Sequence, residues 1–170
     1  KGVSTLGVGV IVEQLTGAKP SPSTVSRVHQ TLEAEFKDWQ ARPLAEHYQY
    51  VFADGTYFTV IYEAEGHKMP VLAVIGIRLD GRREVLLFTT GERENQTAWE
   101  DVLEQLKGRG VRQVDLWITD GNQAMLNAVT TKFPQAQRQR CVKHKMENVL
   151  SYVPHKHRPH VEPELKAIFY

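Results

Sequence analysis

Hydrophobic residues follow helical spacing at both ends of the chain and strand-like alternation in its middle. Residues 3–15 are apolar enough to predict a first helix. A second helix is predicted to begin near Ser21 or Ser23, with Pro22 in its first turn. Its apolar residues form one stripe: Val25, Val28, Leu32, Phe36 and Trp39. Two helices joined by a short Gly-containing turn are typical of a helix-turn-helix, although helical hairpins that bind nothing share the pattern.

The middle of the chain has the spacing of β-strands. Residues 48–62 are apolar on both faces, which predicts a central strand with layers packed on both sides. A second strand over residues 69–79 and a third over residues 82–90 follow. Glu65-Gly66 is expected to form the turn before the second strand. Asp80-Gly81 indicates a two-residue hairpin turn between the second and the third.

Helices and strands then alternate. Trp99, Val102, Leu103 and Leu106 share one face of a predicted helix. The remaining predictions are a buried strand over 114–119, a helix over 122–133, a weakly indicated strand over 136–142, and helical segments over 143–152 and 162–170. The order β-β-β-α-β-α-β-α predicts an α/β fold with a mixed five-stranded sheet and helices on both faces. That order fits the ribonuclease-H-like arrangement, in which the first and fourth strands lie side by side.

Composition places the chain among soluble globular proteins, since 41% of its 170 residues are hydrophobic and 24% are charged. No apolar run approaches the ~20 residues that span a bilayer, so a membrane protein is not expected. The apolar start lacks the cluster of basic residues and the small-residue cleavage site of a secretory signal, and is predicted to be a helix. Cys141 is the only cysteine and cannot form an internal disulfide, which fits a reducing cytoplasm.

The net charge of +1 does not by itself indicate a nucleic-acid partner, but basic residues cluster near the C-terminal end. Between Gln137 and His160, six basic residues accompany one acid, Glu147. The six are Arg138, Arg140, Lys143, Lys145, Lys156 and Arg158. Such a segment could bind phosphates. A solvated helix face is the alternative, and charge alone favours it.

Asp54 interrupts an otherwise apolar strand, and Gly55 follows it. An ionised carboxylate inside a sheet costs several kcal/mol unless it is paired or binds a metal. The glycine would permit close approach by a ligand or a neighbouring backbone. The alternative is a strand end with Asp-Gly as a turn, but apolar alternation resumes directly afterwards.

Asp120 lies at the carboxyl end of a buried strand, where sites form in open α/β sheets. Taken alone, it could equally be a helix N-cap. If the strands of Asp54 and Asp120 are adjacent, at ~4.8 Å, their carboxylates can share one metal or bracket two. Ligation by oxygen alone suits Mg²⁺ or Mn²⁺. Asp115, on the opposite strand face, and Asp80, in a hairpin turn, are poor candidates.

Cys141 and His144 could form half of a zinc site, and three further histidines lie at positions 155, 157 and 160. A closed zinc site needs four ligands, and the spacing of these residues matches no zinc-finger pattern. A buried cysteine near a surface histidine is the simpler interpretation. A cysteine protease is formally possible, but no Gly-rich oxyanion element surrounds Cys141.

Six short motifs over roughly Thr16 to Pro154 resemble the Mutator-like family of bacterial insertion-sequence transposases. They are Ser21–Arg27, Trp39–Leu44, Ala53–Tyr57, Asp80–Leu86, Ile118–Gly121, and Phe133-Pro134 followed by Gln139–His144. The resemblance implies that Asp54 and Asp120 are the first two acids of a DDE-type triad. It also implies that Cys141 and His144 form the family's Cys-x-x-His element.

The family places its third acid, a Glu, after a helical insertion in the core. We therefore expect this chain to be a fragment that lacks the Glu and is inactive alone. The expected domains are a helical segment over 1–42, an incomplete ribonuclease-H-like core over 43–153 and the start of the insertion over 154–170. Glu147 is an alternative third acid, because compact relatives of this fold carry a carboxylate on the helix after the fifth strand.

The function expected from the resemblance is metal-dependent cleavage and strand transfer of double-stranded DNA in the bacterial cytoplasm, at the nucleoid. Candidate DNA-binding residues are Arg27, Arg138, Arg140, Lys143 and Lys145. The full-length protein is expected to form a homo-oligomer, because transposition joins two DNA ends. Two alternatives are a ribonuclease-H-like nuclease that only hydrolyses and a non-catalytic DNA-binding or assembly module.

Overall fold

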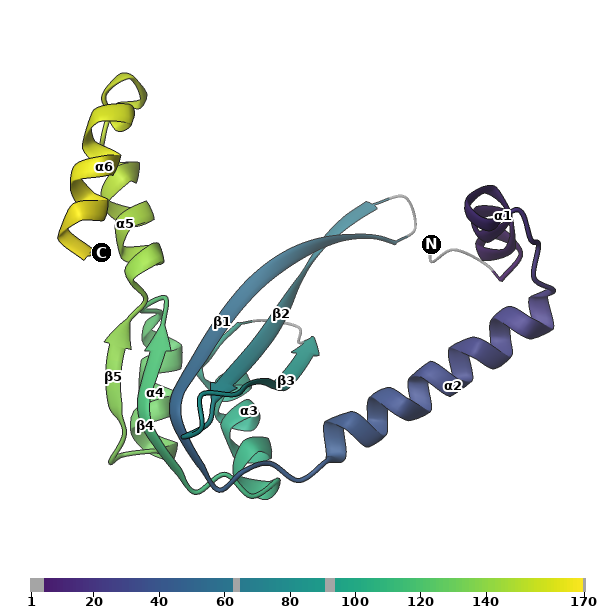
Figure 1. Ribbon diagram of the computed structural model, residues 1–170, viewed down its shortest axis with the longest axis horizontal. Coiled ribbons are helices and arrows are strands. Elements are labelled where there is room, and N and C mark those ends of the chain that lie inside the picture. Colours follow the sequence, from purple (N-terminus) through teal and green to yellow (C-terminus); the bar gives the residue numbers. More distant parts are fainter. Residues whose placement is uncertain (1–4, 63–64, 91–93, 170) are drawn as a thin grey trace. The chain divides into compact units, whose positions relative to one another are not determined.

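The computed structural model describes residues 5–62, 65–90 and 94–169, and the chain divides into two compact units. One unit consists of Lys1–Pro43 with Tyr57–Met69, and the other of Leu44–Thr56 with Pro70–Tyr170. Figure 1 shows the elements of both units in chain order. All residues of the candidate site belong to the second unit.

The first unit begins with two helices, α1 (Thr5–Thr16) and α2 (Pro22–Ala41), which contact each other. The hydroxyl of Ser21 caps α2 by accepting a hydrogen bond from the backbone N–H of Thr24 at 3.1 Å, and Pro22 is the first helical residue. The predicted start of this helix is therefore confirmed. Residues 3 and 4 of the first predicted helix lie outside the described residues.

The apolar stripe of α2 is not covered within the described part of the chain, because α2 has no buried residue. Val28, Leu32 and Phe36 are exposed. Phe36 stacks on Trp39, and the Arg42 guanidinium lies 4.8 Å from the centre of the Trp39 ring. A helix-turn-helix role for this pair stays a prediction.

Five strands form one mixed sheet: β1 (His47–Tyr62), β2 (Glu65–Ile77), β3 (Arg83–Thr90), β4 (Gln113–Thr119) and β5 (Gln137–Arg140). Their order is β3-β2-β1-β4-β5. β2 pairs with β3 antiparallel, whereas β4 is parallel to both β1 and β5. The first and fourth strands thus lie side by side, as predicted, and the fold is ribonuclease-H-like.

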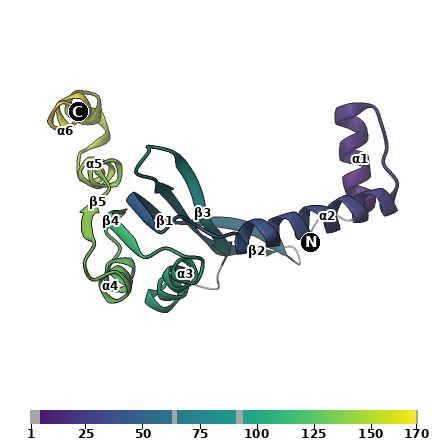
Figure 2. The ribbon, with the colours of Figure 1, turned by 60° about the horizontal axis from the view of Figure 1, so that its bottom comes forward.

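The helices α3 (Gln96–Gly108) and α4 (Gln123–Lys132) pack against each other on one face of the sheet (Figures 1 and 2). All four predicted apolar residues of α3 are buried. They share a core with Tyr48 and Val51 of β1 and Trp117 of β4. The chain ends in α5 (Val142–Ser151), a short 3-10 helix (His155–His157) and α6 (Arg158–Phe169). Among the described helices, none has both the length and the apolar character needed to cross a bilayer.

The other face of the sheet is more open than the sequence predicts. Phe52 of β1 is 38% exposed, and Ile75, Val85 and Phe88 are also exposed. Among the described residues, β1 is therefore buried on the face that packs against α3 and α4, and its other face is partly exposed. Apolar alternation alone could not show this, because it marks a face suited to packing without indicating which segment covers it.

Both predicted turns around the second strand differ from the structure. Glu65 and Gly66 belong to β2, and a Cβ on Gly66 would lie 3.2 Å from the Thr59 methyl, so the glycine permits close packing within the sheet. The turn at Asp80-Gly81 is confirmed in position but spans three residues, Leu79–Gly81. The Arg78 N–H closes it by donating to the Arg82 carbonyl at 2.9 Å, and Gly81 takes the left-handed φ of 82° that such a loop requires.

A partly buried polar network links β1 to β3 and to the turn after β2. The Tyr48 hydroxyl accepts from the Ala45 N–H at 3.1 Å and donates to the Glu84 carboxylate, which Arg78 also holds at 2.8 and 3.1 Å. Burial and the bond to Glu84 raise the pKa of Tyr48 to about 12. A Cβ on Gly76 would lie 2.6 Å from the Tyr48 ring, so this glycine makes room for the ring.

We predict that Tyr48→Phe lowers the free energy of unfolding by about 1–3 kcal/mol, because the Ala45 N–H and one Glu84 oxygen lose a buried partner. Urea denaturation measures this. Tyr50→Phe is the matched control on β1, since the Tyr50 hydroxyl forms no hydrogen bond with the described residues. Equal midpoints for the two variants would contradict the role given to the Tyr48 network.

Candidate functional site

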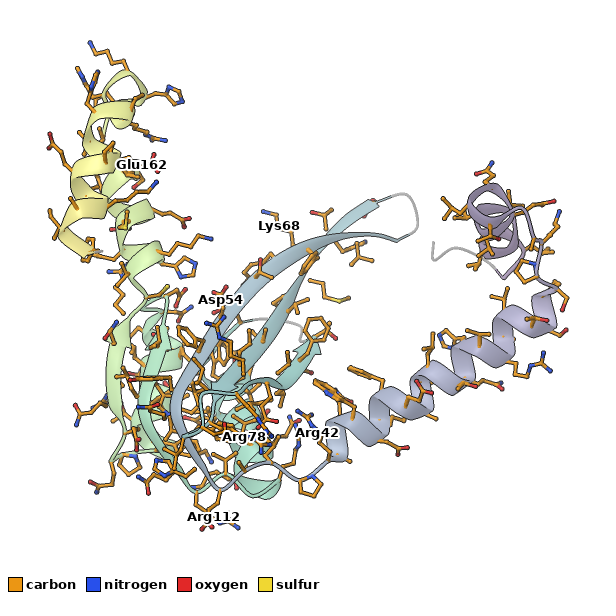
Figure 3. The ribbon with its side chains drawn as sticks, in the orientation of Figure 1. Arg42, Asp54, Lys68, Arg78, Arg112 and Glu162 are labelled. Carbon is orange, nitrogen blue, oxygen red and sulfur yellow. The ribbon has the colours of Figure 1, made fainter. Side chains whose placement is uncertain are left out.

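Asp54 and Asp120 lie on neighbouring parallel strands. Ala53 of β1 is paired with Thr119 of β4, and each aspartate is the next residue along its chain. Neighbouring strands lie about 4.8 Å apart, so the backbone of β1 at Asp54 runs beside the turn that carries Asp120. Asp54 is exposed and Asp120 is half-buried (Figure 3 labels Asp54). The structure therefore brings the two predicted residues together.

The turn after β4 fixes the orientation of Asp120. One Asp120 carboxylate oxygen accepts a hydrogen bond from the Asn122 N–H at 2.8 Å, and Gly121 between them has a left-handed φ of 92°. Arg140 of β5 donates through Nε to the Asp120 carbonyl at 3.0 Å. The N-cap of α4 is Asn122, whose side-chain oxygen accepts from the Ala124 N–H. Asp120 is therefore not the helix cap, which was the alternative interpretation.

Glu94 is a third carboxylate at this site, and sequence reasoning missed it. It lies just before α3 and is half-buried. One of its oxygens accepts hydrogen bonds from Asn122 Nδ2 at 3.1 Å and from Trp99 Nε1 at 3.3 Å. A Cβ on Gly55 would lie 2.6–2.7 Å from the Glu94 carboxyl group, so Glu94 packs directly against the Gly55 backbone. The close approach predicted at Gly55 is thus made by a side chain.

The electrostatics show that Glu94 and the two aspartates share one region. Burial raises the pKa of the Glu94 carboxyl, and the negative charges of Asp120 and Asp54 raise the pKa further. The hydrogen bond from Trp99 acts in the opposite direction. Asn122 contacts both acids, through its backbone N–H to Asp120 and its side chain to Glu94. The site therefore concentrates negative charge between the middle of β1 and the carboxyl end of β4.

The donor atoms at the site fit a hard divalent cation. Asp54 and Asp120 offer only carboxylate oxygens, which Mg²⁺ and Mn²⁺ prefer. No group of three or more His, Cys, Asp or Glu in the described part of the chain has an arrangement that could hold a metal ion. The described residues thus provide a carboxylate pair, with Glu94 held by Asn122 and Trp99.

The Cys-x-x-His element lies at the start of α5. Cys141 is a half-buried free thiol at the N-cap position, and its N–H donates to the Thr119 carbonyl at 2.6 Å. His144 Nδ1 is buried and has no hydrogen-bond partner within the described ranges. Neither residue belongs to a metal-binding cluster there. The role of this element stays a prediction.

The candidate DNA-binding residues are distributed over both units. Arg27 is exposed on α2, in the first unit. Arg138 and Arg140 are exposed on β5, and Lys143 and Lys145 on α5. Glu147, the alternative third acid, is also exposed and lies 3.7 Å from Lys143 as an i,i+4 ion pair. DNA binding by the basic residues and a catalytic role for Glu147 stay predictions.

We predict that Gly55→Ala lowers the free energy of unfolding by about 1 kcal/mol, because the new methyl group displaces the Glu94 carboxyl from its hydrogen bonds with Trp99 and Asn122. In a Glu94→Ala background, Gly55→Ala should lower the free energy of unfolding by clearly less, since the overlapping carboxyl group is absent. Urea denaturation of the four proteins in this double-mutant cycle measures the coupling. Purely additive losses would contradict the packing of Glu94 on Gly55.

We also predict that Glu94→Gln stabilises the fold near pH 7 in EDTA. Glutamine keeps an acceptor for Trp99 and Asn122 but removes a charge that burial and both aspartates disfavour. Because the folded-state pKa of Glu94 is raised, this gain is present above that pKa and disappears as the pH falls below the ordinary pKa of Glu. Thermal denaturation at neutral and acidic pH tests it, and an equal gain at both would contradict it.

Comparison with known proteins shows the family to which the chain belongs. The sequence pattern of the family described as "Transposase, Mutator family" matches residues 1–170. The transposase of insertion sequence element ISRM5 from Rhizobium meliloti is 34% identical over 99% of this chain and 42% of its own length. The transposase of IS256 in transposon Tn4001 from Staphylococcus aureus is also 34% identical, over 99% of this chain and 43% of its own length. The chain thus spans less than half the length of these relatives.

Solved structures give a weaker likeness. A simian T-cell lymphotropic virus intasome is 13% identical over 68% of this chain and 44% of its own, with a TM-score of 0.35. The HTLV-2 integrase catalytic core domain is 13% identical over 67% of this chain and 78% of its own, with a TM-score of 0.33. The fold assignment rests instead on the strand order and directions of this chain. On its sequence, the chain belongs to the Mutator family of transposases.

Proposed function

We propose that this chain forms the larger part of the catalytic core of a DNA transposase, in which Asp54 and Asp120 bind catalytic Mg²⁺ or Mn²⁺. One observation carries the proposal: the parallel pairing of β1 with β4 sets these two aspartates side by side in a member of the Mutator family. The reaction is phosphoryl transfer at the DNA backbone, first cleavage and then joining of a DNA 3′ end to a target.

The protein groups contribute position and charge. Asp54 and Asp120 hold the cations, and the Asn122 N–H orients one oxygen of Asp120. Glu94 adds negative charge near both aspartates and is kept in place by Trp99 and Asn122. Divalent ions bound by these carboxylates would stabilise the attacking and leaving oxygens during in-line displacement. Carboxylates suit this task because they hold hard cations without replacing the nucleophile.

Several parts of the proposal concern the full-length protein. We propose that the family's third acid, a Glu, completes the site in the full-length protein, and Glu147 is the alternative within this chain. Double-stranded DNA, as transposon ends and target, is the proposed substrate, and a homo-oligomer would bring two ends together. Arg27 and the basic residues of β5 and α5 are the proposed phosphate contacts.

Two other functions are compatible with the same residues. A ribonuclease-H-like nuclease would cleave DNA without joining it, so an assay for strand transfer separates it from a transposase. A non-catalytic DNA-binding or assembly module is favoured by the presence of only a carboxylate pair, without a cluster of three potential ligands, among the described residues. Such a module would bind DNA without cleaving it, whichever divalent metal ion is added.

We predict that Asp54→Asn or Asp120→Asn in the full-length transposase reduces Mg²⁺-dependent DNA cleavage at least about 100-fold, because several kcal/mol of transition-state stabilisation are lost with the cation. Affinity for DNA in EDTA should stay nearly unchanged. Cleavage of a labelled duplex that carries the transposon end, together with gel-shift assays, measures the two properties.

Asp115→Asn is the matched control for this experiment. Asp115 is also on β4, but its carboxylate pairs with His47 at 2.8 Å and is held by Gln113. This variant should retain cleavage within a few-fold. Undiminished cleavage by both the Asp54 and the Asp120 variants would remove the basis for the proposed metal site.

A further inference from the structure

A cavity lined by polar and apolar groups opens beside the turn that holds Asp120. It lies between α4 and β5 and has a volume of about 500 Å³. Its walls include Gly121 of the turn, Gln123, Asn127 and Thr130 of α4, and Arg138 and Arg140 of β5. Pockets that hold small ligands typically enclose about 300–1,000 Å³, so this cavity is large enough for one nucleotide. Neither Asp54 nor Asp120 is among the residues that line this cavity.

Two arginines give the cavity its charge. Arg138 and Arg140 alternate with glutamines along β5, and both line the cavity beside α4. The Arg138 guanidinium donates to the Thr130 hydroxyl, and Arg140 donates through Nε to the Asp120 carbonyl. Neither arginine has a carboxylate at ion-pair distance within the described part of the second unit. Both therefore keep N–H donors and a positive charge for a phosphate group.

Gly121 fixes where Arg140 lies. A Cβ on Gly121 would be 2.9 Å from Arg140 Nε and 3.1 Å from Arg140 Cδ, so only glycine lets this side chain cross the turn. Asp120 directly precedes Gly121, and its carbonyl accepts the Arg140 hydrogen bond. The wall of the cavity and the proposed metal site thus share one turn. A phosphate in the cavity would lie close to the cation site proposed at Asp54 and Asp120.

The remaining lining residues are suited to a nucleobase. Gln123 and Asn127 stand one helical turn apart on α4 and are hydrogen bonded to each other at 2.8 Å, and Leu126 adds an apolar surface. Side-chain amides of this kind pair with base edges. Bases in an intact duplex are stacked and cannot enter a concave pocket, so only a nucleotide that has left the stack would use these groups.

We propose that the cavity between α4 and β5 binds one unpaired nucleotide of the DNA strand, next to the cation site proposed at Asp54 and Asp120. Arg138 and Arg140 bind the phosphate of this nucleotide, and Gln123 and Asn127 bind its base. The proposal rests on the proposed function for its choice of DNA as ligand. It assigns the chain a preference for DNA whose strands are unpaired near the site of cleavage.

Fluorescence anisotropy with two labelled DNA probes tests the proposal. One probe is a fully paired duplex, and the other is the same duplex with one unpaired nucleotide in one strand. The 170-residue chain, in EDTA, should bind the second probe on the order of tenfold more tightly, which is the usual contribution of one recognised base. EDTA keeps the measurement independent of the metal site and of cleavage.

Variants separate the base contact from the phosphate contacts. Asn127→Phe fills the cavity without changing charge and should abolish the preference, while affinity for the paired duplex stays within about twofold. Thr131→Phe, at an exposed position of the same helix and outside the cavity lining, is the matched control and should keep the preference. Arg140→Gln should weaken binding to both probes. Circular dichroism melting checks that each variant folds.

The outcomes distinguish this proposal from the proposed function. Equal affinity of the wild-type chain for both probes, or a preference that survives in Asn127→Phe, overturns the nucleotide pocket and leaves the metal site untouched. A clear preference together with undiminished cleavage by the Asp54 and Asp120 variants of the full-length protein overturns the metal site instead. Failure of the chain to bind either probe also overturns the nucleotide pocket, and the cleavage assay on the full-length protein then decides the metal site.

Discussion

The parallel pairing of β1 with β4 is the constraint on which the candidate site depends. Its register sets Ala53 opposite Thr119, so Asp54 and Asp120 follow at adjacent positions. Like charges on neighbouring strands repel each other more strongly the closer they lie. The backbone hydrogen bonds of the sheet and the core beneath it hold the carboxylates together against that repulsion. A divalent cation would turn this repulsion into attraction.

The residues around the pair are arranged to maintain this unfavourable cluster. Asn122 contacts Asp120 and Glu94 and also caps α4, so one side chain links the two acids to a helix start. Two glycines give side chains room at the site: Gly55 packs against Glu94, and Gly121, which has a left-handed φ of 92°, packs against Arg140. Sites that concentrate charge commonly reduce stability, and the rest of the fold must supply the difference. Here the buried core between the sheet and α3–α4 does so.

Most elements of the fold could be predicted from the sequence, because their signals are local. Helix caps such as Ser21, the apolar face of α3 and the Asp80-Gly81 turn all depend on residues a few positions apart. Asp54 and Asp120 were found for the same reason, as acids that interrupt or end apolar strands. The errors arose where local signals are ambiguous. Glu65-Gly66 has the composition of a turn, yet it lies within a strand because glycine also permits close packing there.

The sequence by itself determined the order of elements, the family likeness and the two aspartates, since periodicity and short motifs are written in neighbouring residues. Only the tertiary structure decided that Glu94 joins them, because its contacts with Gly55 and Asn122 span long stretches of chain that no local pattern connects. The same holds for the cavity between α4 and β5, whose walls meet only when the sheet is assembled. Residues that are far apart in the sequence come into contact only when the folded chain packs its helices against the sheet.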